Sequence, residues 1–189
     1  MQVDISGRSV LVVGAGAAGL EKVRRLRAAG AQVTVVDPAP VAQRIRDVAE
    51  VLHRPFQAAD VERRWLVVAA TNSAEVNEEV ETAALAAGVW VNRADRPDGG
   101  QAAFAASLSR GRVEVAVSSG GASPTLSRWV RDTIDAALPE ELATIADLFA
   151  AARASGRPRS HRGVSIDDLV EAVQSGDLLT ARRLVGLGE

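Results

Sequence analysis

Gly14-Ala15-Gly16-Ala17-Ala18-Gly19 follows directly on an apolar run, Ser9–Val13, which has the pattern of a buried β-strand. An amphipathic pattern over residues 17–29, ended by Gly30, predicts that a helix leaves the glycine-rich segment. In such a unit the first glycine permits a tight turn, the second lets the backbone approach a pyrophosphate, and the third lets the helix pack against the strand. We therefore predict a dinucleotide site and take as its first cofactor-binding candidates Gly14, Ala15, Gly16, Ala17 and Ala18.

Asp37 supports this interpretation. It ends a second apolar strand, Gln32–Val36, 18 residues beyond Gly19. A carboxylate at this place can accept hydrogen bonds from both ribose hydroxyls of an adenosine, and it repels a 2′-phosphate. The position thus favours NAD over NADP. The alternative is that Asp37 serves only as a turn residue before Pro38.

Strand and helix patterns alternate through the first half of the chain, which predicts an α/β fold with a Rossmann-type doubly wound parallel sheet. Further elements are expected as a weak helix at 41–50, strands at 51–53, 65–70 and 89–92, and a helix capped by Asn72 and closed by Gly88. We expect this NAD-binding domain to span residues 1–112.

The second half predicts a small α+β dimerisation and substrate-binding region, residues 113–152, and then a linker and helical C-terminal tail, residues 153–189. Its expected elements are strands at 102–109 and 112–118 around Arg110-Gly111, helices at 124–138 (capped by Ser123) and 140–153, a linker at 155–163, and two short helices hinged at Gly176. The helix at 124–138 carries an apolar stripe that we expect to pack against a second copy: Leu126, Val130, Ile134 and Leu138.

Composition excludes several classes of function. The net charge is −2 and the basic residues form no long block apart from 157–162, so we expect no nucleic-acid partner. The absence of cysteine excludes disulfides and thiolate metal sites, and the two isolated histidines, His53 and His161, predict no metal site. No apolar run approaches the roughly 18 residues of a membrane span and no targeting signal is evident, so we expect a cytoplasmic protein without a membrane partner.

The order of motifs resembles the precorrin-2 dehydrogenase and sirohydrochlorin ferrochelatase module of siroheme synthase, in its free-standing form, over about residues 7–152. The matching features are Gly14–Gly19 with Lys22, Ala70-Thr71 with Asn77, Val91-Asn92 leading to Asp95, Phe104, and the run from Ala116 to Pro124. Of these, Val117-Ser118-Ser119-Gly120-Gly121-Ala122-Ser123-Pro124 is the most specific. The resemblance implies a homodimer that oxidises precorrin-2, a tetrapyrrole, to sirohydrochlorin with NAD and often inserts ferrous iron to give siroheme.

The resemblance also implies site residues. Asp95 corresponds to the catalytic aspartate and would act as a general base, although it could instead only cap the turn before Pro97. Thr71 and Asn92 join the cofactor site. The substrate carries many carboxylates, so cations and helix-start N–H groups should bind it, and the candidates are Arg93, Ser118, Ser119, Gly120, Gly121, Ser123 and Arg128. Iron would be a substrate held by the ring nitrogens rather than a resident metal.

The chain departs from the family pattern between Asp95 and Phe104, where a Gly-Gly-Gln insertion lengthens the loop, and the resemblance fades beyond Ala152. A dehydrogenase without chelatase activity therefore remains open. Two further alternatives are a non-catalytic NAD-sensing domain, which leaves the Ser118–Pro124 run unexplained, and an ordinary small-molecule dehydrogenase, for which the chain lacks a substrate domain.

Overall fold

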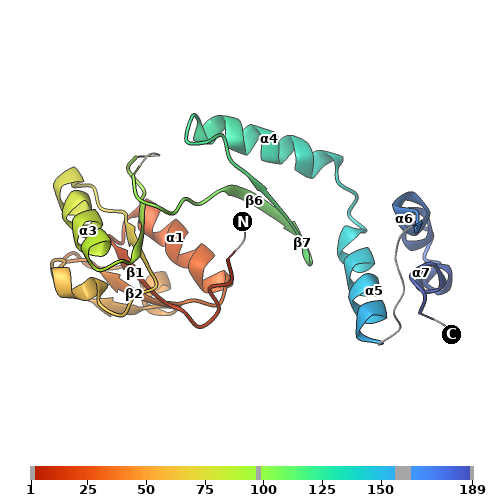
Figure 1. The fold of residues 1–189 in the computed structure, drawn as a ribbon, viewed down its shortest axis with the longest axis horizontal. Helices are drawn as coiled ribbons and strands as arrows, with labels where there is room; N and C mark the ends of the chain where they lie inside the picture. The colour runs from red at the N-terminus through yellow and green to blue at the C-terminus, as the bar shows by residue number, and fades with distance from the viewer. Residues whose placement is uncertain (1–2, 97–98, 156–162, 188–189) are drawn as a thin grey trace. The chain divides into compact units, whose positions relative to one another are not determined.

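The computed structural model describes residues 3–96, 99–155 and 163–187. The chain forms two compact units, Met1–Phe104 and Ala105–Glu189. The boundary falls before the one expected at residue 112, because the first strand after it pairs with the next strand in a hairpin that belongs wholly to the second unit. Figure 1 shows the elements of each unit along the chain.

The first unit is built on a five-stranded parallel sheet of order β3-β2-β1-β4-β5. Its strands are β1 (Ser9–Val13), β2 (Gln32–Val36), β3 (Glu50–Leu52), β4 (Leu66–Ala69) and β5 (Trp90–Arg93). This order confirms the doubly wound Rossmann-type sheet, in which the strand order reverses between β1 and β4. The carboxyl ends of these two strands flank the place where such sheets bind ligands.

Helices cover both faces of the sheet. Alternate residues of β1 point to opposite sides, so Val10 and Val12 pack with α1 (Ala17–Ala28), whereas Leu11 and Val13 pack with α3 (Ala74–Ala86). The remaining helices of this unit are α2 (Gln43–Arg46) and the 3₁₀ helix η1 (Ala58–Val61). Because both faces are buried, the central strands are continuous aliphatic runs, as the sequence predicted.

The second unit starts with an antiparallel hairpin of β6 (Ala106–Arg110) and β7 (Val113–Val117), on which α4 (Pro124–Ala137) packs. Three helices follow, and they share a separate apolar core: α5 (Leu142–Ala154), α6 (Ile166–Gln174) and α7 (Leu178–Leu184). Ser123 caps α4 by accepting a hydrogen bond from the Leu126 N–H at 3.1 Å, as predicted. The two short tail helices on either side of Gly176 are also confirmed.

Several local expectations were wrong. Ser73, not Asn72, caps α3, because its hydroxyl accepts from the Val76 N–H at 3.2 Å. The weak helix expected at 41–50 shortens to α2, since Glu50 joins the sheet as the first residue of β3. The strand expected from residue 102 begins at Ala106. Most of the expected linker, residues 156–162, lies outside the described residues. No helix in the described part of the chain has the length and apolar character needed to cross a membrane.

Candidate functional site

The glycine-rich loop between β1 and α1 has the geometry of a phosphate cradle. Gly14 adopts a positive φ of 100°, and a Cβ there would press against the Ala70 carbonyl of the neighbouring strand end. A Cβ on Gly19 would clash with the Gly14 carbonyl, so this glycine lets α1 approach the loop. Gly16, in contrast, is the N-cap residue of α1 and faces open space, and it has no side chain that could cover the first N–H groups of the helix. The start of α1 is thus open to an anionic group.

Asp37, at the carboxyl end of β2, is tied to this loop. One carboxylate oxygen accepts a hydrogen bond from the Ala15 N–H at 2.7 Å, and the other accepts from the Ala39 N–H at 2.8 Å. Asp37 therefore shapes its own turn, as the alternative interpretation had it, and also holds the glycine-rich loop. Each carboxylate oxygen keeps acceptor capacity for a further donor such as a ribose hydroxyl.

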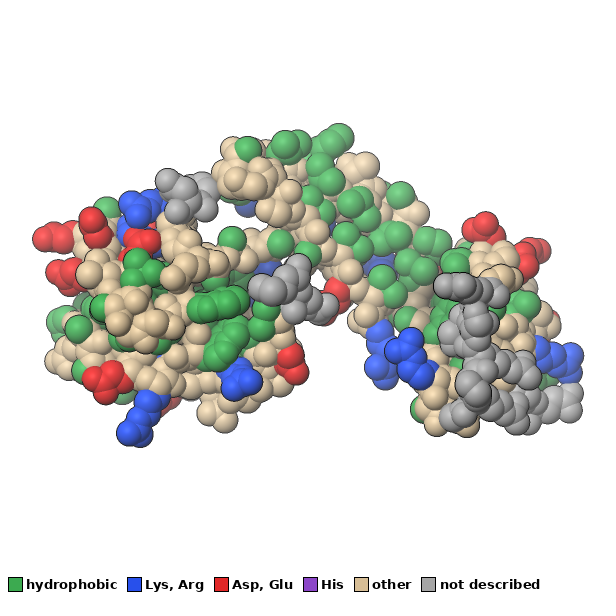
Figure 2. Space-filling model, viewed as in Figure 1, with side chains coloured by type: hydrophobic (Ala, Val, Ile, Leu, Met, Phe, Trp, Pro, Cys, Tyr) green, Lys and Arg blue, Asp and Glu red, His purple; other side chains and the backbone are tan. Residues whose placement is uncertain are grey.

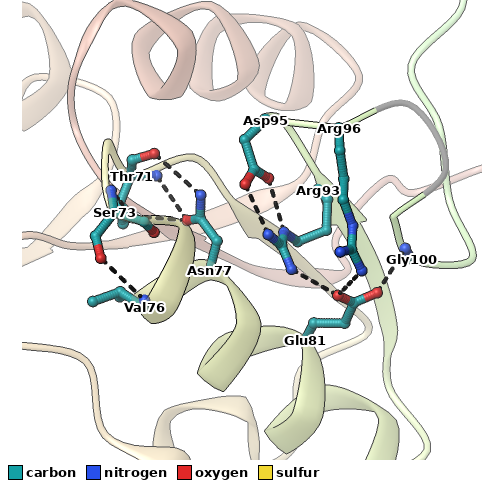
Figure 3. A network of polar contacts seen from close by, with 9 residues as sticks. All are labelled: Thr71, Ser73, Val76, Asn77, Glu81, Arg93, Asp95, Arg96 and Gly100. Carbon is teal, nitrogen blue, oxygen red and sulfur yellow. Dashed lines mark hydrogen bonds and ion pairs between the residues drawn. The ribbon is translucent and has the colours of Figure 1, made fainter.

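The turn from β4 into α3 is locked by Asn77, which is fully buried. Its side-chain oxygen accepts from the Thr71 N–H at 3.0 Å and from the Thr71 hydroxyl at 2.8 Å, and its nitrogen donates to the Thr71 carbonyl at 3.1 Å. Figure 3 shows this cluster at the start of α3. The hydroxyl of Thr71, a predicted cofactor contact, is thus used within its own turn.

Asn92 lies buried on β5. Its side-chain nitrogen donates to the Ala102 carbonyl at 2.8 Å. Its side-chain oxygen is buried and has no hydrogen-bond partner among the described residues. Such an orphaned acceptor is costly unless something donates to it. Together with the open Gly16 and the carboxylate of Asp37, it fits the prediction that this edge of the sheet holds a nicotinamide dinucleotide.

Asp95, the predicted catalytic residue, lies two residues beyond the end of β5 and is held by Arg93 (Figure 3). The Arg93 guanidinium donates to both Asp95 oxygens, at 2.8 and 2.7 Å, in a bidentate pair. These bonds lower the pKa of Asp95 to about 2, against the opposing effect of partial burial and with a smaller contribution from Asn77. Asp95 is therefore an anion throughout the neutral range.

Arg93 itself is buried, with 3% of its side chain exposed. Its remaining terminal nitrogen donates to Glu81 on α3 at 2.7 Å, and both carboxylates raise its own pKa. We predicted Arg93 as a substrate contact, and this placement favours holding Asp95 instead. Sequence reasoning missed Glu81, which carries no motif signal, because nothing in a helical sequence distinguishes it from the surface glutamates beside it.

The Ser118–Ser123 segment belongs to the second unit and folds on itself. Gly120 and Gly121 take positive φ values of 63° and 84°. Ser119 accepts from the Ser123 N–H at 3.0 Å and from the hydroxyl of the buried Ser127 at 3.0 Å. Internal bonds thus use the N–H groups of Gly120, Ala122 and Ser123, which we had expected to point at an anion.

Arg128, on the first turns of α4, is exposed and pairs with no carboxylate in the part of the chain that the structure describes. It therefore remains a predicted substrate contact. Among the residues described, no three His, Asp or Glu side chains gather to hold a metal ion, and His161 lies outside them.

Comparison with known families matches residues 1–106, more than half of the chain, to the NAD(P)-binding family NAD_binding_7. The chain belongs to this NAD(P)-binding family. Residues 110–137 match a second model, the central region of sirohaem biosynthesis proteins. The first match covers the first structural unit and ends two residues beyond it, and the second match lies within the second unit. Together they confirm the resemblance to siroheme synthase drawn from the sequence.

Curated relatives extend the comparison. A siroheme synthase of Tolumonas auensis is 41% identical over 146 residues, covering 76% of this chain and 31% of that protein. Siroheme synthase 1 of Aeromonas salmonicida is 34% identical over 194 residues, covering 95% of this chain and 42% of that one. The chain thus spans less than half the length of these relatives.

Among solved structures, "SirC, precorrin-2 dehydrogenase" matches with a TM-score of 0.73 and 26% identity, over 98% of this chain and 95% of that one. The similarity runs along nearly the whole of both chains. It confirms the fold class for the NAD(P)-binding unit together with the smaller unit that follows it.

Proposed function

We propose that this chain is an NAD-dependent dehydrogenase that oxidises precorrin-2 to sirohydrochlorin in siroheme biosynthesis. The observation that carries the proposal is the Asp95 carboxylate, which buried Arg93 holds in a bidentate pair beyond the carboxyl end of β5. This is the same edge of the sheet on which the glycine-rich loop follows β1. The likeness to a precorrin-2 dehydrogenase over nearly the full length of both chains supports it.

NAD, when bound, supplies the hydride acceptor. The chain's own residues would bind and orient it: the loop around Gly16 and the start of α1 would hold the pyrophosphate, Asp37 would accept from the ribose, and the orphaned Asn92 oxygen would accept from a further donor. The carboxylate of Asp37 disfavours a 2′-phosphate, so we assign NAD rather than NADP.

Asp95 acts on the substrate. Oxidation removes a hydride and a proton, and loss of the hydride leaves positive charge on the macrocycle. An anion fixed beside the ring stabilises that charge without having to reorganise. The low pKa that Arg93 imposes makes Asp95 a weak base, so this electrostatic role comes first and acceptance of the proton follows as the cation forms.

In the second unit we assign substrate carboxylates to Arg128 and to the hydroxyl of Ser118, because the Ser119 hydroxyl already donates to the Ser123 carbonyl. A second copy of the chain would cover α4. Figure 2 shows hydrophobic side chains gathered over this helix. Two large hydrophobic residues of α4 are exposed, Trp129 to 64% and Leu126 to 49%. Val130 and Ile134 of the predicted stripe are instead half-buried, because α4 packs on the hairpin.

The test is a turnover assay with purified protein, precorrin-2 and NAD. We expect sirohydrochlorin absorbance and NADH to rise together in equal amounts, and Asp95→Asn to slow the reaction while NAD affinity stays within a few-fold. NAD binding without any turnover would favour the sensing-domain alternative. A parallel reaction of sirohydrochlorin with ferrous iron, with and without protein, decides whether iron is also a substrate.

A further inference from the structure

We propose that Glu81 is a positioning residue, which holds Asp95 in place by binding Arg93 and the returning backbone at Gly100. The inference rests on the proposed function of Asp95. Glu81 lies in the middle of α3, and neither the sequence patterns nor the known relatives assign it a role.

Three groups converge on the Glu81 carboxylate (Figure 3). One oxygen accepts from Arg93 at 2.7 Å and from Arg96 at 3.0 Å, and the other accepts from the Gly100 N–H at 2.9 Å. Only 13% of the side chain is exposed. A largely buried carboxylate with three donors forms charge-assisted bonds that restrict its orientation.

These groups lie on both sides of Asp95 along the chain. Arg93 and Arg96 come from the chain immediately around it, and Gly100 comes from the segment that returns along β5. Gly100 bridges to Asn92 in antiparallel fashion, with a positive φ of 79°, and a Cβ there would collide with the Val91 carbonyl. Glu81 therefore binds residues on both sides of Asp95, Arg93 and Gly100, and so ties the segment that carries Asp95 to α3.

The charge of Glu81 also matters. Arg93 is buried and serves two carboxylates, and its bidentate face is turned to Asp95 while its third donor is turned to Glu81. Without Glu81, that third donor would lose its partner in a buried place, and the guanidinium would rotate to find one. The orientation of Asp95 would change with it.

Three variants separate these effects. Glu81→Ala removes all three bonds, and we expect the single-turnover rate of hydride transfer to fall about tenfold or more, with the NAD dissociation constant unchanged within about twofold. Glu81→Gln keeps a side-chain oxygen that can accept from Gly100 or from an arginine, so it should recover part of the rate. The matched control is Glu79→Ala, an exposed glutamate of the same helix, which should behave as wild type.

A double-mutant cycle with Asp95→Asn tests whether Glu81 acts through Asp95. If it does, Glu81→Ala should cost about tenfold in the wild-type background and less than about twofold in the Asp95→Asn background. A purely structural role would lower the rate equally in both backgrounds. Equal losses would overturn the proposal.

A second readout does not depend on the reaction. Amide hydrogen exchange at Gly100, followed by NMR, should be slow in wild type and in Glu79→Ala, and at least about tenfold faster in Glu81→Ala. Unchanged exchange at Gly100 would refute the positioning role whatever the kinetics show. If exchange responds as expected but the wild-type protein does not oxidise precorrin-2, then Glu81 holds this segment and it is the proposed function that fails.

Discussion

Replacing Asp37 with asparagine should invert the preference of the protein between NAD and NADP. The Asp37 carboxylate binds the Ala15 and Ala39 N–H groups at 2.7 and 2.8 Å and keeps acceptor capacity for a ribose. A hydrogen bond to a charged group contributes about 1.5–3 kcal/mol. Loss of that charge should therefore weaken NAD binding by roughly 10- to 100-fold.

NADP should respond differently. Two like charges about 4 Å apart near a protein surface repel by up to about 4 kcal/mol before salt screening, and the substitution removes this repulsion from a 2′-phosphate. The gain offsets the lost ribose bond, so NADP affinity should hold or improve. The ratio of the two dissociation constants then moves by about two orders of magnitude toward NADP.

Titration calorimetry with each dinucleotide measures this ratio directly. Asp167→Asn, an exposed aspartate on α6, is the matched control and should leave both affinities unchanged. Asp37→Ala should weaken both dinucleotides further, because it also frees the Ala15 N–H and loosens the glycine-rich loop. If Asp37→Asn weakens NAD and NADP by the same factor, the ribose role of Asp37 is wrong.

Three other outcomes are expected. Gly19→Ala should lower the free energy of unfolding by about 1–3 kcal/mol because its Cβ meets the Gly14 carbonyl, whereas Gly16→Ala should leave urea stability nearly unchanged and weaken NAD. The depressed pKa of Asp95 adds to the free energy of unfolding, in full above the unfolded pKa near 4, and this contribution disappears as pH falls through about 2. In urea titrations between these pH values, wild type should therefore lose roughly 1–2 kcal/mol more unfolding free energy than Asp95→Asn. Trp129→Glu should yield monomers in sedimentation equilibrium where wild type sediments as a dimer; a monomeric wild type would contradict the predicted homodimer.

Much of the first unit was predictable because its signals are local. The strands β1 and β2 match the predicted ranges residue for residue, since each is a largely apolar run that ends abruptly, at Gly14 and at Asp37. The glycine-rich loop was equally predictable, because Gly14 and Gly19 each meet a steric requirement of the strand-loop-helix unit. Ser123 followed by Pro124 fixed the start of α4 in the same way.

The network around Asp95 could not be predicted, because it depends on contacts distant in sequence. Arg93 and Glu81 are 12 residues apart, and only the parallel pairing of β4 with β5 and the packing of α3 bring them together. An arginine at a strand end has the pattern of an exposed cation, so the sequence could not predict that Arg93 is buried between two carboxylates. The late start of β6 has a similar cause, since residues 100–102 pair with β5 instead.

The return of the chain along β5 also governs how the sheet meets other chains. An outer strand normally leaves a row of amide and carbonyl groups open, which invites a foreign strand to pair with it. Here Gln101 and Ala102 donate to the Val91 carbonyl and Gly100 bridges to Asn92, so the chain itself already pairs with this edge of the sheet. The opposite rim, β3, offers three residues. Intermolecular strand addition and the aggregation that follows from it are thereby discouraged at both borders of the sheet.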